Sequence, residues 1–123
     1  MTEKKLKRLC KEWQKRLRLR DWHVNLKVLP KEDMNDSFGE TRTQIRHKAA
    51  LIRIATGHGD DPLISTDYEQ TLVHELLHLM FKGFDHLIPR TGNEYNWLEA
   101  SIELLAIALV EARRGEKIKT QHV

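Results

Sequence analysis

Residues 66–83 read TDYEQTLVHELLHLMFKG, and the middle of this segment is His74-Glu75-Leu76-Leu77-His78. The segment is predicted to form a helix that begins at a capping-box pair, Thr66 and Glu69, and ends at Gly83. Histidines four residues apart lie about 40° from each other on one face of a helix, one turn apart. Both imidazoles can therefore reach one metal ion, whereas Glu75 is offset enough to reach a water molecule bound to that ion.

The opposite side of this predicted helix is apolar and is expected to pack on the core. The apolar residues are Leu72, Val73, Leu76, Leu77, Leu79 and Met80. Polar residues lie near the histidines instead, namely Asp67, Gln70 and Thr71. The helix is therefore expected to bury one side and to leave the histidine side open for chemistry.

The composition is that of one small globular domain. The chain has 123 residues, of which 40% are apolar and 32% are charged, and its net charge is +3. This length suffices for one domain, residues 1–123, with one modest core, and no apolar run is long enough to cross a membrane. The first residues are charged rather than typical of a signal peptide, and the single cysteine, Cys10, allows no internal disulfide. These features favour a cytoplasmic protein, and we expect a monomer.

The residues before the histidine motif predict one helix and a small sheet. Apolar residues recur every three or four positions from Glu3 to Arg18, which predicts an amphipathic helix. Alternation from Trp22 to Val28 predicts a half-buried strand, and residues 31–38 are expected to be a polar loop. Two further strands, Glu40 to Arg46 and Ala50 to Ala55, are expected to form a hairpin.

The residues after the motif predict a second, longer helix. A second capping-box pair, Thr91 and Glu94, opens it, and Gly115 is expected to end it just after Arg114. Its middle, Trp97 to Val110, is apolar nearly all round. The expected fold is therefore α+β, with an N-terminal helix, a three-stranded sheet that includes a hairpin, the motif helix and a long C-terminal helix.

A third metal ligand must come from outside the motif, because a catalytic zinc site needs three protein ligands and a water molecule. Glu99 and Glu103 lie four residues apart in the apolar helix, where a buried carboxylate is costly without a cation nearby. Glu99 is therefore the best candidate ligand, and Glu103 is expected to accept a hydrogen bond from a ligand histidine. His86, just past a glycine, and Asp85 remain alternative third ligands.

The pattern His74-Glu75-x-x-His78 followed by Glu99-x-x-x-Glu103 resembles the zincin metallopeptidases of the gluzincin branch. The run from Glu99 to Ala106 is similar to the corresponding helix of ImmA/IrrE-type peptidases. The small size and the run from Thr71 to His78 resemble small phage- or prophage-encoded metallopeptidases and the single-domain minigluzincins. The resemblance implies a metallopeptidase-like fold, with a small sheet above the motif helix and a site that binds Zn²⁺.

Other zincin branches fit less well. Phe81 and Phe84 stand where the elongated metzincin motif has Gly and His, so that branch is disfavoured. The SprT-like branch has a third histidine downstream, and His86 does not match it clearly. A role in cleaving DNA–protein crosslinks is therefore unsupported.

The expected activity is hydrolysis of peptide bonds in a peptide or protein substrate. Zinc would lower the pKa of its bound water to about 7 and polarise the scissile carbonyl. Glu75 would take a proton from this water and pass it to the leaving amine. Tyr95 or His86 could donate a hydrogen bond to the oxyanion. The edge of the hairpin, around Ala49 to Ala55, could bind an extended peptide by strand addition.

Two functions from other classes stay open. The zinc could be purely structural, in which case Glu75 would have no role as a base. The basic first helix could instead bind nucleic acid, with the zinc fold as its scaffold. Its basic residues, together with those just after it, are Lys4, Lys5, Lys7, Arg8, Lys11, Lys15, Arg16, Arg18 and Arg20. A basic helix face without interleaved aromatic residues is more typical of a solvated surface.

Overall fold

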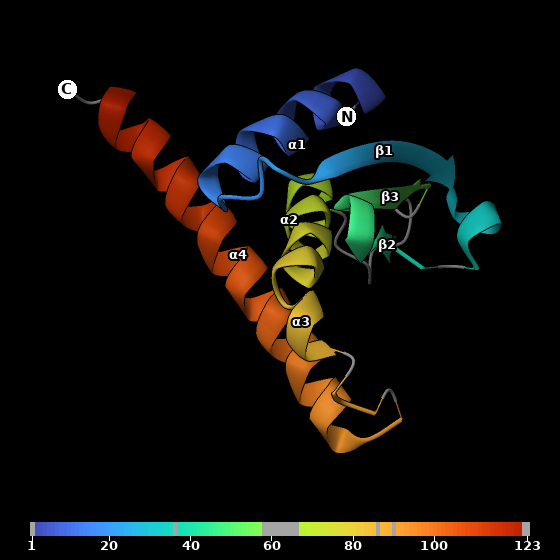
Figure 1. Cartoon of the computed structure of the whole chain (residues 1–123). Coiled ribbons are helices and arrows are strands. Elements are labelled where there is room, and N and C mark those ends of the chain that lie inside the picture. The colour runs from blue at the N-terminus through green and yellow to red at the C-terminus, as the bar shows by residue number, and fades with distance from the viewer. Residues whose placement is uncertain (1, 36, 58–66, 86, 90, 122–123) are drawn as a thin grey trace.

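The computed structural model describes residues 2–35, 37–57, 67–85, 87–89 and 91–121. The elements in order are α1 (Glu3–Arg16), β1 (His23–Pro30), a 3₁₀ turn η1 (Lys31–Met34), β2 (Gly39–Gln44), a 3₁₀ turn η2 (Ile45–His47), β3 (Ala49–Thr56), α2 (Tyr68–Met80), α3 (Lys82–Asp85) and α4 (Asn93–Gln121). Figure 1 shows α2 between the sheet on one side and α4 on the other. The α+β fold expected from the sequence is confirmed, including the long C-terminal helix.

The sheet has the strand order β1-β3-β2, so the last strand in sequence lies in the centre. β2 and β3 are antiparallel, which confirms the predicted hairpin, and β1 pairs with β3 in parallel. Lys48, which joins η2 to β3, adopts a left-handed conformation with a φ of 47°. The central place of β3 corrects one expectation: Ala49 to Ala55 has neighbours along both edges and offers no edge to a peptide. Among the described residues, β2 has a free edge instead.

The core lies between the sheet and the helices α1, α2 and α4. The inner side chains of the sheet, led by Leu26, Ile52 and Ile54, pack against α2 and α1. α2 buries five of the six residues predicted for its apolar side, while Met80, at its end, is exposed. α4 adds Ile102, Ala106 and Val110 from its α2-facing side. α2 is thus held on two sides, and these contacts fix the orientation of its histidine face.

The boundaries of three helices differ from the predictions because packing overrides local signals. α1 ends two residues early, at Arg16, and Arg18 has a left-handed φ of 59°. Asp67 caps α2 by accepting from the backbone N–H of Gln70, whereas Thr66 lies outside the described residues. Glu69, predicted as the partner of that cap, is instead buried against two other helices.

The two glycines predicted to end helices do not do so. α2 ends at Met80, and Gly83 lies inside α3. α4 continues through Gly115 to Gln121. At its other end, the carbonyl of Gly92 accepts from the N–H of Asn96, so the helix begins after Gly92 rather than after Thr91.

Two further features concern the chain outside these helices. Residues 31–38 are not wholly a polar loop, because η1 buries the side chain of Met34. In the part of the chain that the structure describes, we find no helix that is long and apolar enough to span a membrane.

Candidate metal centre

His74 and His78 lie one above the other on the face of α2 that borders a cavity, which residues of β2 and α4 also line. Their ring centroids are 5.1 Å apart, and the rings are tilted by 55°. This stacking follows directly from the four-residue spacing, because residues i and i+4 of a helix lie on the same face. Each side chain is largely buried, yet its Nε2 atom borders a cavity.

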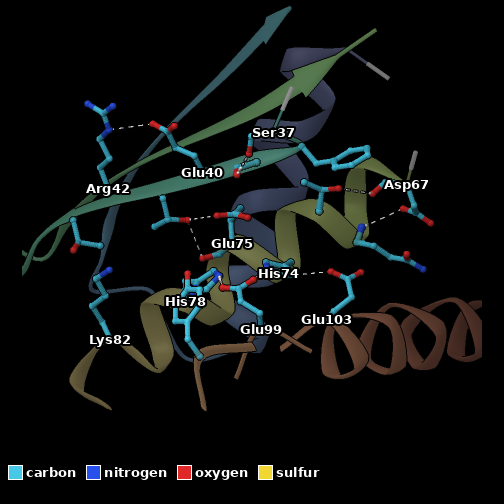
Figure 2. A pocket seen from close by; sticks show the side chains of 17 residues that line it. Ser37, Glu40, Arg42, Asp67, His74, Glu75, His78, Lys82, Glu99 and Glu103 are labelled. Carbon is cyan, nitrogen blue, oxygen red and sulfur yellow. Dashed lines mark hydrogen bonds and ion pairs between the residues drawn. The ribbon is translucent and has the colours of Figure 1, made fainter. Parts of the chain in front are cut away.

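Glu99 of α4 lies against both histidines. One carboxylate oxygen, Oε2, is 3.2 Å from Nε2 of His74, and the other, Oε1, is 3.0 Å from Nε2 of His78. Figure 2 shows this carboxylate below the two rings, reached from the opposite helix. The structure therefore brings together the three residues that the sequence singled out as metal ligands.

The electrostatics of this cluster favour a positive charge at its centre. Hydrogen bonds from His74 and His78 hold the pKa of Glu99 well below its usual range. Burial opposes protonation of His74, but the hydrogen bond to Glu99 and the charge of Glu75 outweigh burial and raise the pKa of His74 to about 9. Without a metal, the proton on His74 balances the negative charges of Glu99 and Glu75. A metal cation bound at the same position would balance them instead.

Glu103 lies on the other side of His74. Its Oε2 atom is 2.6 Å from Nδ1 of His74, which leaves Nε2 of the same ring facing Glu99 and the cavity. A carboxylate that holds the second ring nitrogen fixes the orientation of a metal-binding histidine. The position of Glu103 matches the supporting role expected from the four-residue spacing (Figure 2).

Glu75 points to the opposite wall of the cavity, towards β2. Glu75 is only 6% exposed. Thr41 Oγ1 donates a hydrogen bond of 2.7 Å to Oε1 of Glu75 and lies 3.3 Å from its backbone carbonyl oxygen. Burial raises the pKa of Glu75, although the hydrogen bond from Thr41 and the two histidines oppose this shift. A buried carboxylate with a raised pKa suits a group that must accept and return a proton.

The cavity around these residues has a volume of about 1000 Å³. Its walls are the inner side of β2, the histidine face of α2 and the first turns of α4. Tyr95, one turn before Glu99, and Lys82, in α3, also line it. Successive residues from Ser37 to Thr43 line it, so the cavity extends along most of β2 and has room for an elongated ligand.

Gly39 and Thr41 of β2 belong to the site, although the sequence did not indicate this. A Cβ atom at position 39 would lie 3.0 Å from Oε2 of Glu75 and 3.0 Å from Cγ2 of Thr71, so glycine leaves room for the carboxylate. Thr41 and Thr43 are two residues apart in a strand, so the sequence indicates that they share a face. It does not indicate what that face contacts. The contact joins residues 34 positions apart and depends on how the sheet packs.

Two rival ligands are not tested by this geometry. His86 lies outside the described residues, and so does the side chain of Asp85. His23 is exposed on β1.

The donor set fits zinc. Donor atoms of His74, Glu75 and His78 lie within 4.8 Å of one another, so they could hold a metal ion. Two imidazoles and one carboxylate are a common set for catalytic zinc. Either Glu75 or Glu99 could supply that carboxylate. Glu99 fits better, because it already contacts both Nε2 atoms, whereas Thr41 holds Glu75 to one side.

Comparison with protein-family models, with curated proteins and with solved structures finds no match to this chain. The resemblance to zincins therefore remains a prediction.

Proposed function

We propose that the protein is a zinc-dependent metallopeptidase of the gluzincin type. The observation that carries this proposal is the place of the Glu99 carboxylate, within 3.2 Å of Nε2 of His74 and 3.0 Å of Nε2 of His78. In this proposal Glu75, next to this cluster, is not a ligand and acts as the base. A purely structural site would have no use for such a carboxylate beside its ligands.

In this proposal His74, His78 and Glu99 hold the zinc ion, and Glu103 orients His74. When bound, zinc supplies a Lewis acid that polarises a carbonyl and lowers the pKa of water to about 7. Glu75 takes a proton from the attacking water and returns it to the leaving amine, a role that its raised pKa supports. Of the two residues expected to donate a hydrogen bond to the oxyanion, Tyr95 belongs to the described part of the chain and lines the same cavity.

The substrate in this proposal is an extended segment of a peptide or protein. The free edge of β2, Gly39–Gln44, offers backbone N–H and C=O groups beside the cavity, and a peptide can pair with such an edge as an added strand. β2 takes the role that the sequence had suggested for Ala49 to Ala55.

Metal content, measured by elemental analysis of the purified protein, is the first test. We expect one zinc per chain in the wild type and in His86→Ala, and loss of zinc in Glu99→Ala. Loss in His86→Ala with retention in Glu99→Ala would move the third ligand to His86. Absence of metal from every sample, even after zinc is added back, would remove the enzyme proposal.

The second test separates catalysis from a structural role for zinc. Glu75→Gln removes the base but keeps the shape of the side chain. We expect it to retain zinc and to lose hydrolysis of a mixed library of fluorogenic peptides. Equal hydrolysis by Glu75→Gln and the wild type would exclude Glu75 as the base.

Nucleic-acid binding is a second candidate function, because α1 presents an unbroken basic face to solvent. Lys4, Lys7, Arg8, Lys11 and Lys15 are all exposed and share the side of α1 that lies away from Leu6 and Trp13. Binding that depends on this face would weaken steeply as salt is raised. It would also be lost when Lys7, Arg8, Lys11 and Lys15 are replaced together by Gln, with zinc content unchanged.

A further inference from the structure

The side of α4 that faces away from α2 is apolar, and none of the described residues outside α4 packs over it. Trp97 is 75% exposed, Leu104 69% and Leu105 38%. With Ser101, Ala108 and Ala112, which are also exposed, these residues form what we call the outer stripe. The outer side of a helix that packs on one side only normally carries charged residues. Contiguous exposed apolar residues typically mark an interaction surface.

The outer stripe is separate from the candidate metal centre. At 100° per residue, its middle lies about 180° around α4 from Glu99 and from the buried Val110. Figure 1 shows α2 on one side of α4 and no described element on the far side. A partner on the outer stripe would therefore leave the cavity open.

The sizes of the stripe residues are complementary when the helix is reversed. An antiparallel copy centred between Leu104 and Leu105 places each residue i opposite residue 209 − i. Trp97 then lies opposite Ala112, Ser101 opposite Ala108, and Leu104 opposite Leu105. The largest side chain thus meets one of the smallest, and all six residues are matched by one two-fold axis. We propose that the outer stripe binds the same stripe of a second copy of this chain, with the two α4 helices antiparallel.

Charge also favours the antiparallel arrangement. Exposed acidic residues beside the stripe include Glu94, before its first turn, and Glu111, at its border. An antiparallel copy places Glu94 at the level of Gly115 of the partner and Glu111 at the level of Leu98 of the partner. A parallel arrangement would set the two Glu111 side chains beside each other and the two Trp97 rings against each other. Antiparallel helices additionally place the opposite ends of their dipoles together.

The size of the surface predicts a weak dimer. A Trp side chain can bury up to about 250 Å², so Trp97, which is 75% exposed, offers roughly 190 Å² to a partner. The stripe runs for about 22 Å along the helix, at about 1.5 Å per residue. With its flanking residues it still falls below the roughly 20 to 30 residues a side of a standard interface. We therefore expect the dimer to dissociate in the micromolar range.

Sedimentation velocity of the full-length protein, from about 1 μM to about 300 μM, tests the dimer. We expect the average mass to rise from one chain to two across this range. Trp97→Glu should weaken the dimer at least about tenfold, since it places a charge in both of the Trp97–Ala112 contacts. Leu87→Glu is the matched control, because Leu87 is 70% exposed but lies outside α4, and it should dimerise like the wild type.

A mass of one chain at every concentration, or a dimer that Trp97→Glu does not weaken, would overturn the proposal. The orientation has its own test. Chains carrying Ser101→Cys mixed with chains carrying Ala108→Cys should form an oxidised cross-link, whereas neither variant should cross-link to itself. Identical positions lie about 10 Å apart along the axis, beyond the roughly 7 Å that a disulfide spans. Self-cross-linking of Ser101→Cys would contradict the antiparallel arrangement.

Discussion

At the scale of single residues, the site depends on how firmly Glu75 is held. A catalytic base must present one oxygen to water, and a carboxylate can rotate unless something fixes it. Thr41 Oγ1 fixes Oε1 of Glu75 with a hydrogen bond of 2.7 Å, and Gly39 leaves space beside Oε2. In the proposed function, Oε2 is thus the oxygen left for chemistry, and Thr41 would be a positioning residue.

Thr41→Val tests this role because it keeps the shape of the side chain and removes the hydroxyl. We expect peptide hydrolysis to fall about tenfold to a hundredfold, the range typical of residues that hold a catalytic group in place. The loss should lie in kcat, with KM and zinc content unchanged. Activity of the zinc-loaded variants and elemental analysis provide the measurement.

Thr41→Ser is the matched control for this substitution. It restores the hydroxyl on a smaller side chain and should recover most of the activity. Thr43→Val, at the next inward position of β2, should have much less effect, since Thr43 lines the cavity but the hydroxyl that donates to Glu75 is that of Thr41. Equal activity of Thr41→Val and the wild type would exclude the positioning role.

At the scale of elements, one buried carboxylate joins three helices. Glu69 of α2 accepts a hydrogen bond of 2.8 Å from Trp13 Nε1 of α1, and its Oε2 lies 2.7 Å from Nε of Arg113 in α4. The side chains of Glu69 and Arg113 are only 4% and 6% exposed. Arg114 adds a further contact to Oε1 of Glu69. The relative placement of α2 and α4, and hence of the histidines and Glu99, depends on this cluster.

Glu69→Gln should destabilise the fold by about 3 kcal/mol at pH 7, because it removes the closest counter-charge of the buried Arg113 and leaves the more exposed Glu12, at 3.6 Å. The pH dependence follows from the carboxyl itself. Burial opposes its ionisation, but hydrogen bonds from Arg113 and Trp13 outweigh burial and lower the pKa of Glu69 in the folded state. A lowered pKa stabilises the fold above the ordinary value, about 4.3, and this contribution is lost as the pH falls through the folded-state pKa.

Urea unfolding at pH 7 and in steps below pH 4 measures this effect. The difference in free energy of unfolding between the wild type and Glu69→Gln should shrink as the pH falls. Asp21→Asn, which removes an exposed ion pair with Lys48, should change stability little at pH 7. A difference that stays constant down to pH 2 would show that Glu69 acts through packing rather than charge.

The elements were predictable where their signals are local, and less so where they are not. The four-residue spacing of His74 and His78, and of Glu99 and Glu103, was enough to predict which side chains share a face. The glycine rule failed at Gly83 and Gly115, because glycine only lowers helix propensity by about 1 kcal/mol and packing can override it. Sequence patterns could not show that Thr41 reaches Glu75 or that Glu69 reaches Arg113, since these contacts depend on the relative placement of whole elements.

At the scale of the whole molecule, the two opposite sides of α4 have different roles in our proposals. Its inner side carries Glu99 and Glu103 to the cavity, and its outer side carries the stripe that we propose as the dimer contact. The composition, with 40% apolar residues, gives no sign of this surface, and the monomer expected from the sequence stays a prediction that the dimer experiment tests. Because the two sides lie opposite each other, dimerisation and metal binding should be independent, and Trp97→Glu should keep its zinc.

Zinc should link α2 to α4 and thereby stabilise the whole fold. His74 and His78 belong to one helix and Glu99 to the other, so unfolding must separate the ligands. A ligand that binds only the folded state stabilises it by about 2.7 kcal/mol at a concentration a hundred times its Kd. For a chain of this length, that corresponds to a rise in Tm on the order of 10 °C. Scanning calorimetry of the metal-free protein with and without zinc measures the rise.

Mg²⁺ should not reproduce this rise in Tm, because Mg²⁺ binds oxygen ligands rather than imidazoles. Glu99→Ala should show a much smaller rise, since two histidines on one helix no longer tie the two helices together. An equal rise in Glu99→Ala and the wild type would place the third ligand elsewhere.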